Sequence, residues 1–432
     1  MPTIGIDSVS AYLPGYRLNQ GLAAELAVPP ELPLAAPDED GLTMAWEALR
    51  HLDVTEAPLV LRVPGGDLEP RAVAAHLATS GPLRTPSAVL PLSARTGATA
   101  ALTAAPGGVA VLADHGRPAD PADPPSPDGA LALRLGTGRA AEILAVETLP
   151  VLAYDRWRDT EPTGPPDPRF VEETLLATDG GELLDRLVKR AGRTRDDLAG
   201  VVLSACVPVR APRWAARWQV PAVWTAGPEY AAGRLAAATL RTAFERLVAA
   251  GPGSLVAVLE LGWGGDALLL RAGPDIAETV RIEARASLDE YGYRLWTRTL
   301  STSDSAMWTS PAKLRREAPA LVGLTGTRCA TCADVAFPPR HTCDLCGGTD
   351  LAPTELARTG TVVSHNLDRL FAAPDRDVQM VVVDLDGGGR FFGQLAAGSS
   401  RWAEVDDRVT LALRRLHDGG DLPHYFWKAV LP

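Results

Sequence analysis

The chain has 432 residues, enough for two to four domains at roughly 100–200 residues each. Hydrophobic residues make up 46% and charged residues 22%, which is ordinary for globular proteins and excludes a fibrous or largely disordered chain. The net charge of -11 disfavours nucleic acid and anionic membranes as partners. No apolar run reaches the roughly 18 residues of a membrane span, and the N-terminus lacks a signal-peptide pattern, so we expect a cytoplasmic protein.

The first part of the chain alternates short apolar runs with segments of helical spacing. Helices are predicted at Glu39–His51, Glu69–Ala78 and Thr96–Ala104. The predicted strands between and around them are Ile4–Ala11, Leu59–Val63, Ala88–Leu92, Gly108–Ala113 and Ala130–Leu135. This order predicts a largely buried sheet covered by helices.

A second α/β series follows a proline-rich loop at 116–129. Its helices are predicted at Phe170–Ala191, Pro212–Gln219 and Glu229–Ala250, and its strands at Gly200–Ser204, Leu255–Leu259 and Ala267–Arg271. Two halves of similar order suggest a pseudo-duplicated fold, with halves at 1–145 and 146–290. Gly262, Gly264 and Gly265 are interpreted as a tight hairpin, because no helix follows them as a phosphate loop would require.

The character of the chain changes after residue 290. An aromatic-rich connector at 291–324 leads to a cysteine cluster at 325–354 and then to a tail at 355–432. Strand-like runs in the tail are Thr361–His365, Met380–Leu385, Arg390–Leu395 and Val409–Leu413, with a glycine turn at Gly387–Gly389. The tail therefore predicts a small β-barrel.

Four of the five cysteines form two CxxC pairs, Cys329 with Cys332 and Cys343 with Cys346. Each pair places two thiolates on one turn, and two such turns close a tetrahedral zinc site. A site with four sulfur ligands has no open position, so its role is structural. His341 is interpreted as a bystander. Redox dithiols are the alternative reading.

Zinc ribbons often bind nucleic acid, which makes a nucleic-acid-binding protein a further hypothesis. The stretch around the cysteines carries only Arg340 as a firm positive charge, and the tail is mixed in sign. A basic stripe with stacking aromatic residues is missing, so the sequence favours other functions.

The segment RCATCADVAFPPRHTCDLCGGTDL, followed by TGTVVSHN, resembles the DUF35 family over residues 321–432. That resemblance implies a rubredoxin-like zinc ribbon joined to an OB-fold that binds acyl-CoA. The first 290 residues resemble the thiolase superfamily, in particular the branch of HMG-CoA synthase and ketoacyl synthase III. The motifs that carry this resemblance are IGIDSVSAYLPGYRL, DEDGLTMAWEALRHL, TGATAALTAA and GWGGDALLLR. Together they imply a thiolase-like layered αβαβα body, usually dimeric.

The thiolase resemblance implies a cysteine nucleophile, with a histidine and a second histidine or asparagine that stabilise the developing negative charge. This chain departs from that pattern: Arg95 stands near the nucleophile position, between Ser93 and Thr96, and Cys206 stands where the histidine belongs. There is no histidine from 116 to 340 and no asparagine from 20 to 365. The standard pair therefore cannot come from the second half.

Two functional readings remain open beside the nucleic-acid hypothesis. In the first, the body is a degenerate partner of an intact condensing enzyme and handles CoA-bound or carrier-bound acyl groups in polyketide-like or specialised metabolism. In the second, it is an acyltransferase with a nonstandard nucleophile such as Ser93. Cys206 is either a small apolar filler or a reactive thiol.

A helix with three arginines is the candidate contact for the acyl carrier. Arg210, Arg213 and Arg217 either meet CoA phosphates or an acidic carrier protein, or form a solvated helix face with tryptophans packed inward. The expected partners are therefore a second copy of the chain or a catalytic ketosynthase, and an acyl carrier protein.

Overall fold

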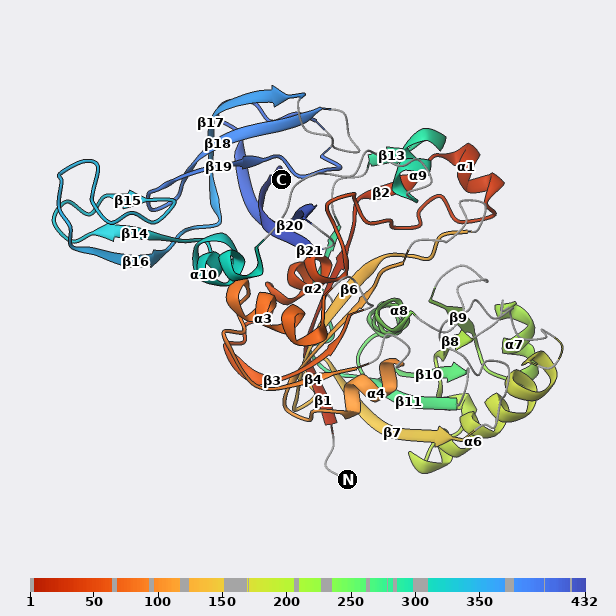
Figure 1. The fold of residues 1–432 in the computed structure, drawn as a ribbon. Coiled ribbons are helices and arrows are strands. Elements are labelled where there is room, and N and C mark those ends of the chain that lie inside the picture. The colour runs from red at the N-terminus through yellow and green to blue at the C-terminus, as the bar shows by residue number, and fades with distance from the viewer. Residues whose placement is uncertain are drawn as a thin grey trace.

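The computed structural model describes residues 4–63, 68–92, 97–116, 124–150, 169, 171–205, 210–226, 235–261, 265–277, 279–282, 286–297, 310–369, 377–399, 401–419 and 422–432. We call the elements from β1 to α9 the body and those from α10 to β21 the C-terminal module (Figure 1). Within the described residues, every helix is too short or too polar to cross a membrane.

The strands of the body form two halves with the same order. The first half contains β1 (Ile4–Leu13), β3 (Glu56–Arg62), β4 (Thr85–Pro91), β5 (Val109–Asp114) and β6 (Gly129–Gly136). The second half contains β7 (Ala141–Leu149), β8 (Gly200–Ala205), β9 (Val223–Thr225), β10 (Leu255–Leu261) and β11 (Gly265–Ala272). Their spatial orders, β4-β3-β5-β6-β1 and β9-β8-β10-β11-β7, repeat one topology.

The two halves join where β1 pairs antiparallel with β7, at Ile4 opposite Ile143. The short strand β12 (Thr279–Ile282) adds to β1 in parallel. Within each half the outer strands are parallel and the inner ones antiparallel, as the pairs β3–β5 and β5–β6 show. The predicted strands of both halves are confirmed, whereas β7, β9 and β12 were missed.

Helices cover and separate the two halves to give five layers. Helices α2 (Gly41–Leu49) and α3 (Pro70–Ser80) lie on the outer face of the first half. Helices α4 (Ala98–Thr103) and α8 (Ala236–Ala250) lie between the halves, in one core with the inner faces of both. Helices α6 (Gly180–Arg190) and α7 (Ala211–Trp218) cover the outer face of the second half. The predicted layered αβαβα body is confirmed.

Local chemistry sets the ends of these helices. The predicted helix at Glu39–His51 begins only at Gly41, because Asp40 caps it and exchanges hydrogen bonds with Thr43. The predicted helix at Phe170–Ala191 is divided: a π-helical segment at Val171–Asp179 precedes α6. Gly180 stands at the division, and a Cβ there would lie 2.8 Å from a methyl group of Leu261. The close packing on β10 requires glycine at this point.

A small satellite core joins the start of the chain to the end of the body. Strand β2 (Tyr16–Leu18) pairs in parallel with β13 (Ala286–Leu288), and helices α1 (Gln20–Glu25) and α9 (Glu290–Trp296) pack beside them. Figure 1 shows this group beside the barrel of the C-terminal module. Within the segment predicted as a connector, α9 ends at Trp296 and α10 (Pro311–Leu321) leads into the module.

The C-terminal module consists of a ribbon and a nearly closed barrel. The ribbon sheet contains β14 (Thr325–Cys329), β15 (Val335–Ala336) and β16 (Leu351–Glu355). The barrel contains β17 (Thr359–Asp368), β18 (Val378–Leu385), β19 (Arg390–Gln394), β20 (Arg408–Gly419) and β21 (Leu422–Val430), in the order β19-β18-β17-β20-β21. A bridge between Leu395 and Ala429 links the two edges. The predicted glycine hairpin at Gly387–Gly389 joins β18 to β19, with a positive φ at all three residues.

The barrel packs on the body, whereas the ribbon extends away from it (Figure 1). One hydrophobic cluster contains Trp46 and Leu49 of α2, Leu77 of α3 and, from the barrel, Leu413 and Trp427. The rings of Trp46 and Trp427 meet edge to face, with their centroids 5.3 Å apart. The barrel and the outer helices of the body therefore share one core.

Candidate functional site

The four clustered cysteines come together as the sequence predicts. Their sulfur atoms all lie within 4.8 Å of one another, and the Cys329–Cys346 and Cys332–Cys343 sulfur pairs are each 3.6 Å apart. Four thiolates at about 2.3 Å from one zinc ion would stand about 3.8 Å apart, so the donor set fits tetrahedral zinc. A disulfide requires about 2.05 Å, so these are thiols.

Two turns of the same geometry hold these thiols. Cys329 donates its N–H to the carbonyl of Asp334 and accepts from Ala333, while Cys343 donates to Gly348 and accepts from Gly347. Ala333 and Gly347 occupy equivalent places, and both have a positive φ. In the first turn the backbone N–H groups of Cys332 and Thr331 lower the pKa of Cys329 to about 6. A thiolate stabilised in this way is ready to bind a metal.

Among the described residues, the group that can hold a metal contains only the four cysteines, and His341 is exposed outside it. The site supplies four sulfur ligands and leaves no position for substrate. It can fix the ribbon but cannot activate water.

The predicted catalytic residues Ser93, Arg95 and Cys206 lie outside the described residues. The same holds for two glycines of the β10–β11 hairpin, Gly262 and Gly264. The residues on both sides of the predicted nucleophile turn are described: Leu92 follows β4, and α4 begins at Ala98.

A carboxylate occupies the start of α4. Glu260 of β10 accepts hydrogen bonds from the backbone N–H groups of Ala98, at 2.7 Å, and Thr99, at 2.9 Å. A Cβ at Gly97 would lie 2.6 Å from a carboxylate oxygen of Glu260, so a side chain there would displace this carboxylate. Burial raises the pKa of Glu260, and the two N–H groups oppose that rise. The carboxyl group of Glu260 therefore binds the N–H groups of the residues that follow the predicted nucleophile turn.

Glu260→Ala should destabilise the body by about 1–3 kcal/mol, because the N–H groups of Ala98 and Thr99 lose their acceptor away from bulk water. Glu260→Gln should cost less, since its amide oxygen can still accept one of the two bonds. Urea unfolding monitored by circular dichroism measures both. Glu245→Ala, which removes an exposed partner of Arg241 on α8, is the matched control. A loss no larger than that of the control would contradict this role for Glu260.

A buried ion pair lies in the central layer near α8. Arg62 at the end of β3 contacts Asp114 at the end of β5 at 2.7 Å, and both side chains are at most 3% exposed. Asp114 also accepts from the N–H of Ala238 in the first turn of α8. Sequence reasoning missed Arg62, Asp114 and Glu260. Each of the three is a single charged residue within or at the end of an apolar strand. That pattern in the sequence could have indicated a buried charge.

Two of the three candidate arginines belong to α7, and Arg210 is the residue before it. All three are exposed, while Trp214 and Trp218 are buried, as the solvated-face reading predicts. Arg213 pairs with Glu172 at 2.8 Å, and both Arg213 and Arg217 lie over the ring of Trp214. The arginines are thus together on one outer surface of the body, and their contact with an acyl carrier stays a prediction.

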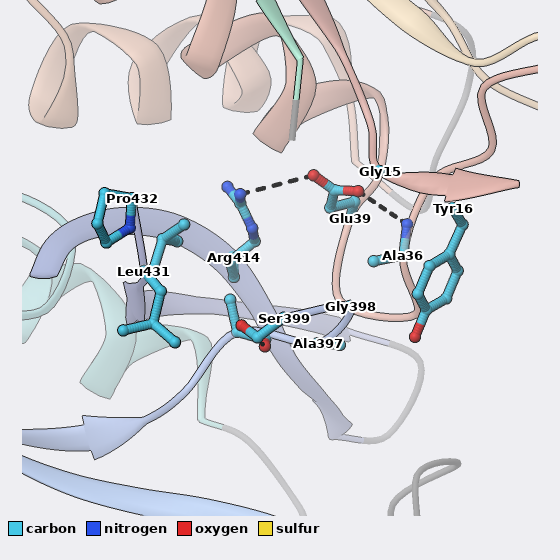
Figure 2. A pocket seen from close by; sticks show the side chains of 12 residues that line it. Gly15, Tyr16, Ala36, Glu39, Ala397, Gly398, Ser399, Arg414, Leu431 and Pro432 are labelled. Atoms are coloured by element: carbon cyan, nitrogen blue, oxygen red, sulfur yellow. Dashed lines mark hydrogen bonds and ion pairs between the residues drawn. The ribbon is translucent and has the colours of Figure 1, made fainter. Parts of the chain in front are cut away.

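A small pocket lies where the barrel meets the body (Figure 2). Its lining includes Tyr16 and Glu39 from the body and Ser399, Arg414 and Leu431 from the module. A volume of about 30 Å³ holds about one water molecule. A second pocket, at Asp114 and Arg241, is smaller, at about 10 Å³. Neither pocket has room for an acyl chain.

Glu39 in the first pocket is almost fully buried. Its carboxylate accepts from Tyr12 Oη and from the N–H of Ala36 at 2.8 Å, and it faces Arg414 at 3.5 Å. Burial raises the pKa of Glu39 to about 7, against the opposing effect of Arg414. The folded chain therefore holds this proton up to a higher pH than the unfolded chain does.

The sign of the resulting pH dependence follows from linkage. Stability contributed by a raised carboxyl pKa is fully present below about pH 4.5 and is lost as the pH rises through about 7. The change amounts to about 3 kcal/mol at most. Relative to Glu39→Gln, the unsubstituted chain should lose thermal stability between pH 5 and pH 8. Parallel melting profiles of the two proteins across that range would contradict the buried, proton-holding state of Glu39.

Two sequence comparisons concern the C-terminal module. Residues 316–352 match the family described as "ChsH2, rubredoxin-like zinc ribbon domain". A stretch of 119 residues is 24% identical to a DUF35 domain-containing scaffold protein of Methanothermobacter thermautotrophicus, covering 27% of this chain and 90% of the relative.

Solved structures resemble both parts of the chain. The 3-oxoacyl-(acyl carrier protein) synthase III FabH of Pseudomonas aeruginosa is 19% identical, with a TM-score of 0.45 over 63% of this chain and 98% of that structure. The Ltp2-ChsH2(DUF35) aldolase is 26% identical, with a TM-score of 0.22 over 30% of this chain and 97% of that structure. The chain thus joins a layered α/β body of two similar halves to a C-terminal module with a rubredoxin-like zinc ribbon, as the sequence predicts.

Proposed function

We propose that this chain handles CoA-bound or carrier-bound acyl groups as a noncatalytic partner of an intact condensing enzyme, in polyketide-like or specialised metabolism. The observation that carries the proposal is the carboxylate of Glu260 at the start of α4. Glu260 occupies the backbone N–H groups of Ala98 and Thr99, which are therefore not available to stabilise a thiolate, an alkoxide or an oxyanion at the predicted nucleophile turn. The absence of histidine from 116 to 340 acts in the same direction.

The surface of the C-terminal module supports a partner role. Large apolar side chains are exposed on it at several places, of which Leu345 at 73% and Phe392 at 61% are the most open. The other exposed apolar residues of the module are Val363, Leu367, Trp402 and Val405. On the described part of the body, the corresponding residues are Leu90, Val248 and Tyr291. We propose that a partner protein covers these side chains, which would remove their apolar surface from water. The name of the curated relative, a scaffold protein, agrees with this role.

The zinc ion in this proposal is structural, and the arginines of α7 would meet the phosphates of CoA or an acidic carrier protein. A homodimer is also proposed. β4 is an edge strand of the large sheet, and most of its residues, Leu90 among them, are exposed. An open edge strand is readily covered by a second copy.

Coexpression with a catalytically intact ketosynthase from the same organism tests the partner role. We expect a stable complex on size-exclusion chromatography and product formation by the ketosynthase that depends on this chain. Phe392→Asp should weaken the complex, and Val248→Asp, on the body, is its control. A ketosynthase that neither binds the chain nor changes its rate would count against the proposal, and salt-sensitive binding in a gel-shift assay would favour the nucleic-acid alternative.

A further inference from the structure

Carboxylates of the body face cations of the module where the barrel meets the body. The carboxylates come from one short segment of the body: Asp38, Glu39, Asp40 and Glu47. The cations of the module come from β20 and β21: Arg414, Arg415 and Lys428. The body itself adds Arg50, which contacts Glu47 at 2.9 Å. We call the four carboxylates the acidic segment. The three cations of the module lie more than 360 residues away from it in the sequence.

The pairs within this contact are short and largely removed from water. Arg414 contacts Glu47 at 2.9 Å, and both side chains are at most 2% exposed. Lys428 contacts Asp38 at 2.9 Å, and Tyr425 donates its hydroxyl to Asp40 at 2.5 Å. Buried opposite charges with hydrogen-bonded partners select one geometry, because removing either partner leaves a charge without compensation.

The backbone fixes the same arrangement. Asp38 accepts the N–H of Ala397, at 2.9 Å, on its carboxylate, and the N–H of Arg415, also at 2.9 Å, on its carbonyl oxygen. Arg358 of the module lies over the rings of Trp46 and Trp427, at 5.6 and 4.8 Å from their centroids. Hydrogen bonds, aromatic contacts and ion pairs thus converge on one patch of α2 and the turn before it.

We infer that the acidic segment is a recognition site for the DUF35 barrel, and that the barrel stays bound to it without the covalent connection. The module is then a resident subunit of the body. The β20–β21 face of the barrel is covered by the body. Any further protein therefore contacts the ribbon or the other barrel strands. This inference concerns contacts within the chain and does not depend on the proposed partner function.

Cutting the full chain tests the inference. A site-specific protease sequence is placed between Thr297 and Ser310, the purified chain is cut, and the products are separated by size-exclusion chromatography at micromolar concentration. We expect the body and the module to elute together. In Arg414→Glu, where the new carboxylate faces Glu39 and Glu47, association should weaken at least about a hundredfold.

Two further variants keep the test decisive if Arg414→Glu does not fold. Lys428→Met removes one charge at nearly constant volume and should weaken association through the unpaired Asp38. Arg408 lies on β20, as Arg414 does, and forms an exposed pair with Asp386. Arg408→Glu breaks this pair, and the cut chain should elute as the parent does. Separation of the fragments of the unsubstituted cut chain would overturn the inference. So would undiminished association in Lys428→Met upon dilution.

Discussion

Arg414→Met should lower the free energy of unfolding by about 3–5 kcal/mol, because it removes a buried cation that faces the carboxylates of Glu39 and Glu47, although Arg50 still contacts Glu47. The guanidinium of Arg414 contacts Glu47 at 2.9 Å and Glu39 at 3.5 Å, and it donates to the carbonyl of Leu413. Its neighbours raise its pKa well above the ordinary value against the effect of burial, so it stays charged. Methionine fills a similar volume, which separates the charge effect from the effect of a cavity.

Urea unfolding at pH 7, followed by tryptophan fluorescence, measures this change, since Trp46 and Trp427 meet beside the ion pair. Arg408→Met is the matched control on the same strand. It removes an exposed pair with Asp386 and should leave the unfolding midpoint nearly unchanged. Equal effects of the two substitutions would show that the buried charges do not hold the barrel on the body.

The second large effect is expected at the ribbon. Cys343→Ser should abolish zinc binding and with it the order of β14 to β16, because structural zinc contributes roughly 10–16 kcal/mol in small zinc domains. Cys343 is 3% exposed and Cys329 is 1% exposed, so two of the four ligands are buried within the ribbon. The body should stay folded, since its cores contain none of these residues.

Metal analysis should give one zinc per chain in the parent protein and none in Cys343→Ser. Limited proteolysis should cut the variant within 325–355 first. His341→Ala is the control, because His341 is exposed and lies outside the four-sulfur group. Zinc retained at one per chain in Cys343→Ser, or lost in His341→Ala, would contradict the four-cysteine site.

Apolar runs predicted most strands of this fold to within a few residues, because a buried strand must be apolar over its whole length. β7 was missed since Glu142 and Glu147 interrupt its pattern, although both pair with arginines of neighbouring elements. The division before α6 was missed because Gly180 packs closely against Leu261, which is far away in the sequence. Local patterns do not record such contacts.

The candidate sites divide in the same way. The zinc site was predictable because all four ligands lie within 18 residues and their spacing defines the geometry. The contact between Asp38–Glu47 and Arg414–Lys428 was not, since each segment alone resembles an ordinary charged surface. Glu260 at the start of α4 is a contact of the same kind, because β10 and α4 meet only in the folded chain.

We expect that the body does not itself take up an acyl group. Intact mass spectrometry after incubation with a panel of acyl-CoAs measures this. We expect the mass of the chain to stay unchanged with every acyl-CoA, in the parent protein and in Ser93→Ala alike. A stoichiometric acyl adduct on the parent chain that disappears in Ser93→Ala would contradict the account and establish an acyltransferase with a serine nucleophile.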